Sequence, residues 1–131
     1  MVKLAYMMNR RNGPAAAQRF AERRRREQDA PRLREQVPNL VSLQLEIEER
    51  SGDAGIKHLR RVVVDHAPAL FLVPCGDSKC IAGEHDLTPA VMQALRARET
   101  SFHGKDECRG TPGLSPCSRE VRFEAVAQYR P

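Results

Sequence analysis

Four cysteines are the residues of this 131-residue chain whose type and spacing favour a specific chemistry. Cys75 and Cys80 form a Cys-x4-Cys pair directly after an apolar run, and Cys108 and Cys117 form a Cys-x8-Cys pair directly before an alternating one. A tetrahedral Cys₄ zinc site needs thiolates that converge on one ion from loops, so the two pairs predict a structural Zn²⁺ site. The glycines that would let these loops curl around an ion are Gly76, Gly110 and Gly113.

Other uses of the thiols stay open, because neither pair has the Cys-x2-Cys spacing of the strongest zinc signatures. Two disulfides, unbridged thiols or an iron–sulfur cluster are the alternatives. The N-terminus lacks the pattern of a secretory signal, so we expect a cytoplasmic protein with reduced thiols, which favours metal. His85 follows Cys80 by five residues and His103 precedes Cys108 by five, so either histidine could replace a thiolate.

A catalytic role for the metal is less favoured. Pro74-Cys75, followed by a second cysteine and a helix, resembles the second half of the zinc nucleobase deaminase signature. The spacing is Cys-x4-Cys instead of Cys-x2-Cys, and no His-x-Glu lies upstream at a helix start to supply a ligand and a proton shuttle. We therefore expect a protein that is not an enzyme, with a zinc-dependent hydrolase or deaminase as a weaker alternative.

The net charge of +5 is unevenly distributed. Residues 1–36 contain ten basic and four acidic residues, for a net charge of +6, whereas residues 37–131 have a net charge of −1. This split predicts a basic, partly helical N-terminal segment, residues 1–36, attached to a zinc-stabilised α+β domain, residues 37–131. An electrostatic function would belong to the first segment.

An arginine-rich stretch of that segment could contact nucleic acid. Arginines neutralise phosphates without reading sequence, and the segment has too few aromatic side chains to recognise single strands by stacking. An acidic protein partner, or a solvated helix whose arginines pair with glutamates of the same chain, are the alternatives. The candidate nucleic-acid-binding residues are Arg19, Arg23, Arg24, Arg25 and Arg26.

The elements that must position these residues follow from periodicity. A helix is expected after Pro14, with a break at Pro31 and a second short piece before Pro38. Alternation predicts strands over 40–48 and 121–129, three consecutive valines favour a strand over 58–64, and the continuous apolar run 69–73 predicts a strand covered on both faces. A helix is expected from Thr88 to about residue 98, with the Thr88 hydroxyl as its N-cap, and a loop over 100–119.

These elements predict an α+β fold: a small antiparallel sheet, made of a three-stranded meander plus a C-terminal strand, with helices on one face and the Cys₄ zinc site at the sheet edge. The order helix, three strands, helix is similar to that of double-stranded-RNA-binding domains, although none of that family's loop motifs can be placed.

We therefore expect a non-enzymatic, zinc-stabilised binding module that contacts nucleic acid or a ribonucleoprotein surface through its arginine-rich segment. A protein–protein interaction or scaffold module with a purely structural metal is the alternative. No run approaches the roughly 18 apolar residues of a membrane span, so no membrane partner is expected. The sequence does not indicate an oligomeric state.

Overall fold

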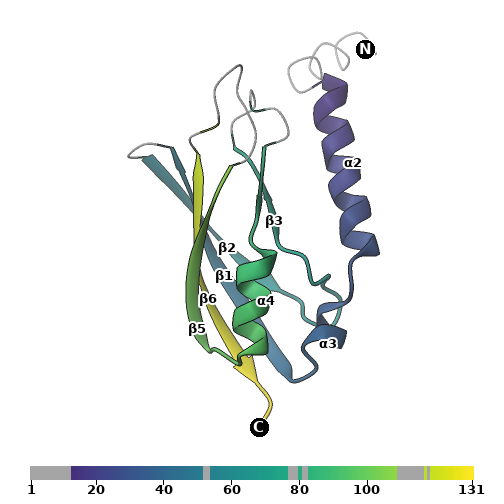
Figure 1. The fold of residues 1–131 in the computed structure, drawn as a ribbon, viewed down its shortest axis with the longest axis vertical. Helices are drawn as coiled ribbons and strands as arrows, with labels where there is room; N and C mark the ends of the chain where they lie inside the picture. Colours follow the sequence, from purple (N-terminus) through teal and green to yellow (C-terminus); the bar gives the residue numbers. More distant parts are fainter. Residues whose placement is uncertain (1–12, 52–53, 77–79, 81–82, 109–116, 118) are drawn as a thin grey trace.

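The computed structural model describes residues 13–51, 54–76, 80, 83–108, 117 and 119–131 (Figure 1). These residues form three helices and six strands. The helices are α2 (Gly13–Asp29), α3 (Leu33–Gln36) and α4 (Thr88–Arg96). The strands are β1 (Leu40–Ser51), β2 (Ala54–Val62), β3 (Leu72–Pro74), β4 (Glu84–Asp86), β5 (Ser101–Glu107) and β6 (Glu120–Tyr129).

The main sheet has four antiparallel strands in the order β2-β1-β6-β5. Its central strands confirm the predicted alternation, because Leu45 and Ile47 of β1 and Phe123 of β6 are buried on the same face. The residues between them, such as Glu46 and Glu124, are exposed on the other face. One face of the sheet therefore carries the core, and the other is open to solvent.

The predicted three-stranded meander is not found. β3 does not join β2; it pairs with β4 to form a separate two-stranded ribbon. The apolar run that leads into β3 is buried at Ala69, Phe71, Leu72 and Val73. Two of its amides bond outside the ribbon: the Ala69 amide donates to the Pro31 carbonyl and the Phe71 amide to the Thr88 hydroxyl. The apolar character of this run reflects packing against the core, and it did not require a central strand. The likeness in element order to double-stranded-RNA-binding domains is lost with the meander.

β5 was predicted as loop and is instead an edge strand of the main sheet. Its alternation is hidden because a glycine occupies one of the positions on the core side. A Cβ on Gly104 would lie 2.7 Å from the Phe123 ring, so the glycine makes room for a core side chain. Only Phe102 is a buried apolar residue of this strand.

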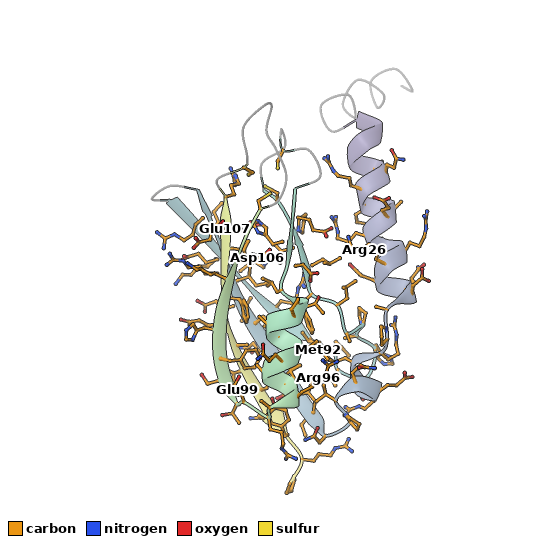
Figure 2. All side chains as sticks on the ribbon, viewed as in Figure 1. Arg26, Met92, Arg96, Glu99, Asp106 and Glu107 are labelled. Atoms are coloured by element: carbon orange, nitrogen blue, oxygen red, sulfur yellow. The ribbon has the colours of Figure 1, made fainter. Side chains whose placement is uncertain are left out.

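α3 and α4 cover the core face of the sheet, as expected. Leu33 of α3 and Val91 and Leu95 of α4 belong to one core cluster with the inner side chains of β1 and β6. Arg96 of α4 donates to the Gln36 side chain of α3, on the same side of α4 as Met92 (Figure 2).

The N-cap at α4 differs from the prediction. The Thr88 amide bonds the Asp86 carboxylate, and its hydroxyl accepts from Phe71 instead of capping the helix.

α2 stands apart from the main sheet, at the side of the molecule where the β3–β4 ribbon lies (Figure 1). It forms a single helix up to Asp29, and Pro31 follows its end, as predicted. None of its described side chains is buried, and Phe20 is 54% exposed. The chain is anchored again at Leu33, whose amide donates to the Ala67 carbonyl. The boundary at residue 36 stays a prediction, but the core already begins at Leu33.

Candidate metal centre

The four cysteines lie at the ends of two hairpins. Cys75 and Cys80 belong to the connection between β3 and β4, and Cys108 and Cys117 to the connection between β5 and β6. Backbone bonds close each connection beside its first cysteine: the Cys75 amide donates to the Gly83 carbonyl, and the Cys108 amide to the Arg119 carbonyl. The pairs therefore meet because the two hairpins lie side by side, with β4 in contact with β5.

The sulfur atoms form a compact group in which all four lie within 4.8 Å of one another. The Sγ atoms of Cys75 and Cys117 are 3.8 Å apart, and those of Cys80 and Cys108 are 3.5 Å apart, so each of these contacts joins one hairpin to the other. A tetrahedron with metal–sulfur bonds of about 2.3 Å has sulfur–sulfur edges of about 3.8 Å. The cluster thus has the size and the ligand type of a four-thiolate metal site, and it could hold an ion.

Burial and the neighbouring sulfurs favour the protonated form of the Cys80 thiol. Cys80, Cys108 and Cys117 are buried, Cys75 is half-buried, and none of the four is in a disulfide. Burial raises the pKa of the Cys80 thiol, and its contacts with Cys108 and Cys117 raise it further. Four thiolates this close would repel one another strongly, so a divalent cation is needed to stabilise the ionised form.

Gly83 makes the tight packing of the first pair possible, and the sequence analysis missed it. A Cβ at this position would lie 2.5 Å from the Cys80 sulfur and 2.6 Å from the Cys75 Cβ. Its position three residues after Cys80 was the available signal, since glycine permits close approach of the backbone to a site. Gly76, which was predicted to help, is exposed, and Gly110 and Gly113 lie outside the described residues.

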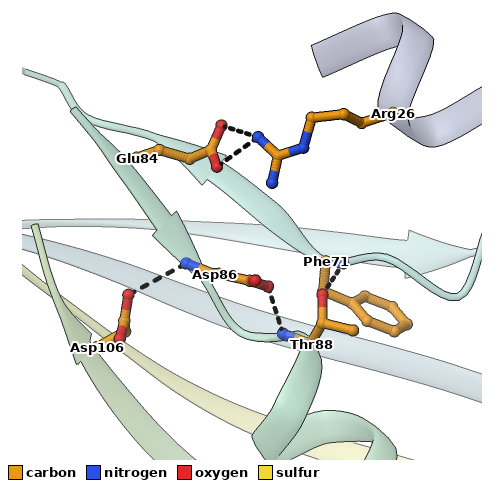
Figure 3. A network of polar contacts seen from close by, with 6 residues as sticks. All are labelled: Arg26, Phe71, Glu84, Asp86, Thr88 and Asp106. Carbon is orange, nitrogen blue, oxygen red and sulfur yellow. Dashed lines mark hydrogen bonds and ion pairs between the residues drawn. The ribbon is translucent and has the colours of Figure 1, made fainter. Parts of the chain in front are cut away.

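Carboxylates fix the two hairpins and α2 to one another (Figure 3). The Asp106 carboxylate of β5 accepts from the Asp86 amide of β4 at 3.1 Å, and Glu84 of β4 accepts from Arg26 of α2 at 2.9 and 3.1 Å. In the described part of the chain these acidic groups therefore act as structural acceptors close to the cysteines.

Neither predicted histidine belongs to the sulfur group. His85 is buried on β4 with its Nδ1 3.9 Å from an Asp106 oxygen, whereas His103 is exposed on β5.

The arginines of α2 divide into two sets. Arg19, Arg23 and Arg26 lie on one helix face and line a crevice of about 150 Å³ together with Glu22, Gly83 and Glu84. Arg24 and Arg25 are exposed and do not line it. The crevice places the first set beside the cysteine cluster, since Gly83 belongs to both. Contact of either set with nucleic acid stays a prediction.

Comparisons of this chain with models of protein families, with curated proteins and with solved structures found no match. Among the described residues, no helix combines the length and the apolar character that crossing a membrane requires.

Proposed function

We propose that this protein is a small binding module whose four cysteines hold a structural Zn²⁺. The observation that carries the proposal is the group of four sulfurs within 4.8 Å of one another, contributed in pairs by two hairpins. Zinc suits four thiolates, and its structural sites are almost always tetrahedral. A cluster of two or four irons would place iron and sulfide between the cysteines and would need wider spacing.

Four thiolates leave a tetrahedral ion with no position for water, which is the arrangement of a structural site. A hydrolase or deaminase would need an open position and a carboxylate poised beside it. The nearby Glu84 and Asp106 accept bonds from Arg26 and from a backbone amide, which supports a structural role.

Metal content tests this part of the proposal. Protein purified without chelator should contain one zinc per chain, and Cys75→Ser should lose the zinc and lower the melting temperature. Ser42→Ala is a suitable control, because Ser42 is exposed on β1 away from the cysteines. Wild-type protein that is purified without chelator and contains no zinc would overturn the zinc assignment.

The partner that we propose for α2 is nucleic acid. α2 contains five arginines and only three acidic residues. Arg24 and Arg25 make no ion pair with any described residue. Exposed guanidiniums on a helix that stands off the domain can reach successive phosphates. An acidic protein surface is the alternative partner.

The salt dependence of the affinity distinguishes contacts with phosphates from other kinds of binding. Affinity for a duplex of mixed sequence should fall as salt rises, and Arg24→Ala with Arg25→Ala should make the slope of log K against log salt shallower by about 2 if both contact phosphates. The control removes two exposed basic side chains elsewhere, Lys105→Ala with Arg130→Ala. No measurable binding at low salt, or equal effects of the two double variants, would reject the proposal.

A further inference from the structure

The edge strand β2 carries features of an interaction surface. It is the end strand of the sheet order and pairs only with β1, so its other edge presents unpaired backbone groups. Three of the six exposed large apolar side chains of the described residues lie on β2 or directly after it: Ile56 is 68%, Leu59 49% and Val63 65% exposed. Apolar side chains gathered along an open edge favour pairing with another strand.

The same strand is strongly basic. Lys57, His58, Arg60 and Arg61 follow one another around Leu59, and β2 contains no acidic residue. Lys57 is already engaged, because its ammonium lies 3.6 Å from Glu46 and 3.9 Å from Glu48 of β1. Arg60 and Arg61 make no ion pair with any described residue, so two positive charges at the edge are available to a partner.

The strand register places these two charges on opposite faces of the sheet. Arg60 is paired with Leu45, whose side chain lies in the core, and Arg61 is paired with Gln44 on the solvent face. A strand added to the open edge would place consecutive residues on alternate faces in the same way. Two adjacent acidic residues in that strand could therefore meet Arg60 and Arg61 at the same time.

An apolar groove continues the edge at the C-terminal end of β2. It has a volume of about 240 Å³, and apolar residues dominate its walls, with His66 and the two arginines beside them. The apolar lining comes from Val62, Val63, Pro68, Leu70 and Phe71. A groove of this size can accept an apolar side chain of an added strand, which would anchor it next to the charged contacts.

Charge opposes the pairing of this edge with β2 of a second copy of the chain. Antiparallel pairing of two β2 strands around Leu59 would place Lys57 opposite Arg61 and His58 opposite Arg60, and like charges directly opposite one another are destabilising. β1, which occupies the other edge of β2, shows the favourable case, because its Glu46 and Glu48 both form ion pairs with Lys57. Charge thus opposes self-association and favours an acidic strand.

We propose that the open edge of β2 binds an extended acidic peptide segment by strand addition, with two adjacent acidic residues on Arg60 and Arg61 and an apolar side chain in the groove at Phe71. This partner is a protein, and its site is separate from the arginines of α2. Binding here requires neither nucleic acid nor the metal to take part.

A labelled seven-residue peptide tests the proposal: Thr and Val residues around two central glutamates, with a matched peptide that carries glutamines. The wild-type protein should bind the glutamate peptide, and backbone amides of β2 should gain protection from hydrogen exchange. Arg60→Glu with Arg61→Glu should weaken this binding about tenfold or more, because both contacts become repulsive. Lys105→Glu with His103→Glu, on the opposite edge strand, is the control and should have little effect.

Two further outcomes would overturn the inference. If Arg24→Ala with Arg25→Ala abolishes peptide binding and the β2 variant does not, the peptide binds α2. If the protein forms a concentration-dependent dimer that the β2 variant dissociates, the edge pairs with a second copy. Equal affinity for the glutamate and glutamine peptides would also contradict the proposed contacts. Circular dichroism of the β2 variant checks that this variant remains folded.

Discussion

At the scale of single residues, the packing of the cysteine cluster depends on Gly83. Gly83→Ala would introduce a methyl group 2.5 Å from the Cys80 sulfur, in a place where the backbone is tied to Cys75 by a hydrogen bond. We expect this variant to lose its metal or to bind it at least tenfold more weakly, as measured by competition with a chromophoric chelator.

Gly76→Ala provides the matched control for that prediction. Its Cβ would lie 3.0 Å from an Arg119 guanidinium nitrogen, at the far end of a flexible side chain that can move aside. Metal affinity should therefore change little in this variant. If both glycine variants retained the metal equally well, the packing of Gly83 against the sulfurs would have no role in the site.

The raised pKa of the Cys80 thiol predicts how metal binding depends on pH. Burial raises the pKa of Cys80 above its ordinary value of about 9, so without metal the thiol keeps its proton at neutral pH. Metal binding must release that proton, and metal affinity should rise from pH 6 to pH 8 and fall when acid is added. Competition with a chelator at several pH values measures this change in metal affinity. An affinity independent of pH would contradict the assignment of thiolate ligands.

The metal-free protein should show the opposite trend at alkaline pH. The folded pKa of Cys80 is raised, so its contribution to the free energy of unfolding is present below the unfolded value near 9 and is lost as pH rises above it. Denaturant titrations of the metal-free protein at pH 7.5 and pH 10 measure the free energy of unfolding below and above this value. Equal loss of stability between these pH values in Cys80→Ser would assign the effect to other groups.

At the scale of elements, alternation predicted β1 and β6 correctly as strands, because both have one buried and one solvated face, but it did not predict that they lie at the centre of the sheet. The segment around Phe71 was wrongly predicted as part of the meander. Its side chains pack in the core, and this produces the same apolar run that a central strand would show. β5 was missed because Gly104 and Asp106 occupy its core-side positions. The cysteines were placed correctly at strand ends, but which hairpins carry them depended on long-range pairing, which a local pattern does not specify.

Gly104 offers a test of how β5 packs on β6. Gly104→Ala would bring a methyl group within 2.7 Å of the Phe123 ring, which is 2% exposed and cannot move into solvent. Overpacking of this kind costs about 1–3 kcal/mol, and we expect a loss of stability in that range by urea denaturation. His103→Ala, on the exposed face of the same strand, should change stability by less than about 0.5 kcal/mol. An unchanged midpoint for Gly104→Ala would show that the two strands are less tightly packed.

At the scale of the whole molecule, two separate clusters hold the protein together. The main core joins the four-stranded sheet to α3 and α4, and the cysteine cluster lies apart from it. A metal held by the four cysteines would therefore connect the hairpin ends without being part of the main core. The arginines of α2 and the open edge of β2 belong to different regions, so each proposed contact can be removed without disturbing the other.

Metal removal should accordingly act on one end of the molecule. We expect chelation to abolish hydrogen-exchange protection at the amides of Cys75 and Cys108, which close the two hairpins, while amides of the central pair β1 and β6 stay protected. Exchange measured residue by residue with and without chelator distinguishes the two regions. Uniform loss of protection would mean that the metal is required for the main core as well.

X-ray absorption at the zinc edge tests the central claim most directly. On protein purified without chelator, the account predicts a first shell of four sulfur atoms at about 2.3 Å, because the four cysteines offer a tetrahedron of that size. A first shell that contains nitrogen or oxygen, as a histidine or water ligand would give, or the absence of zinc from the folded protein, would contradict it.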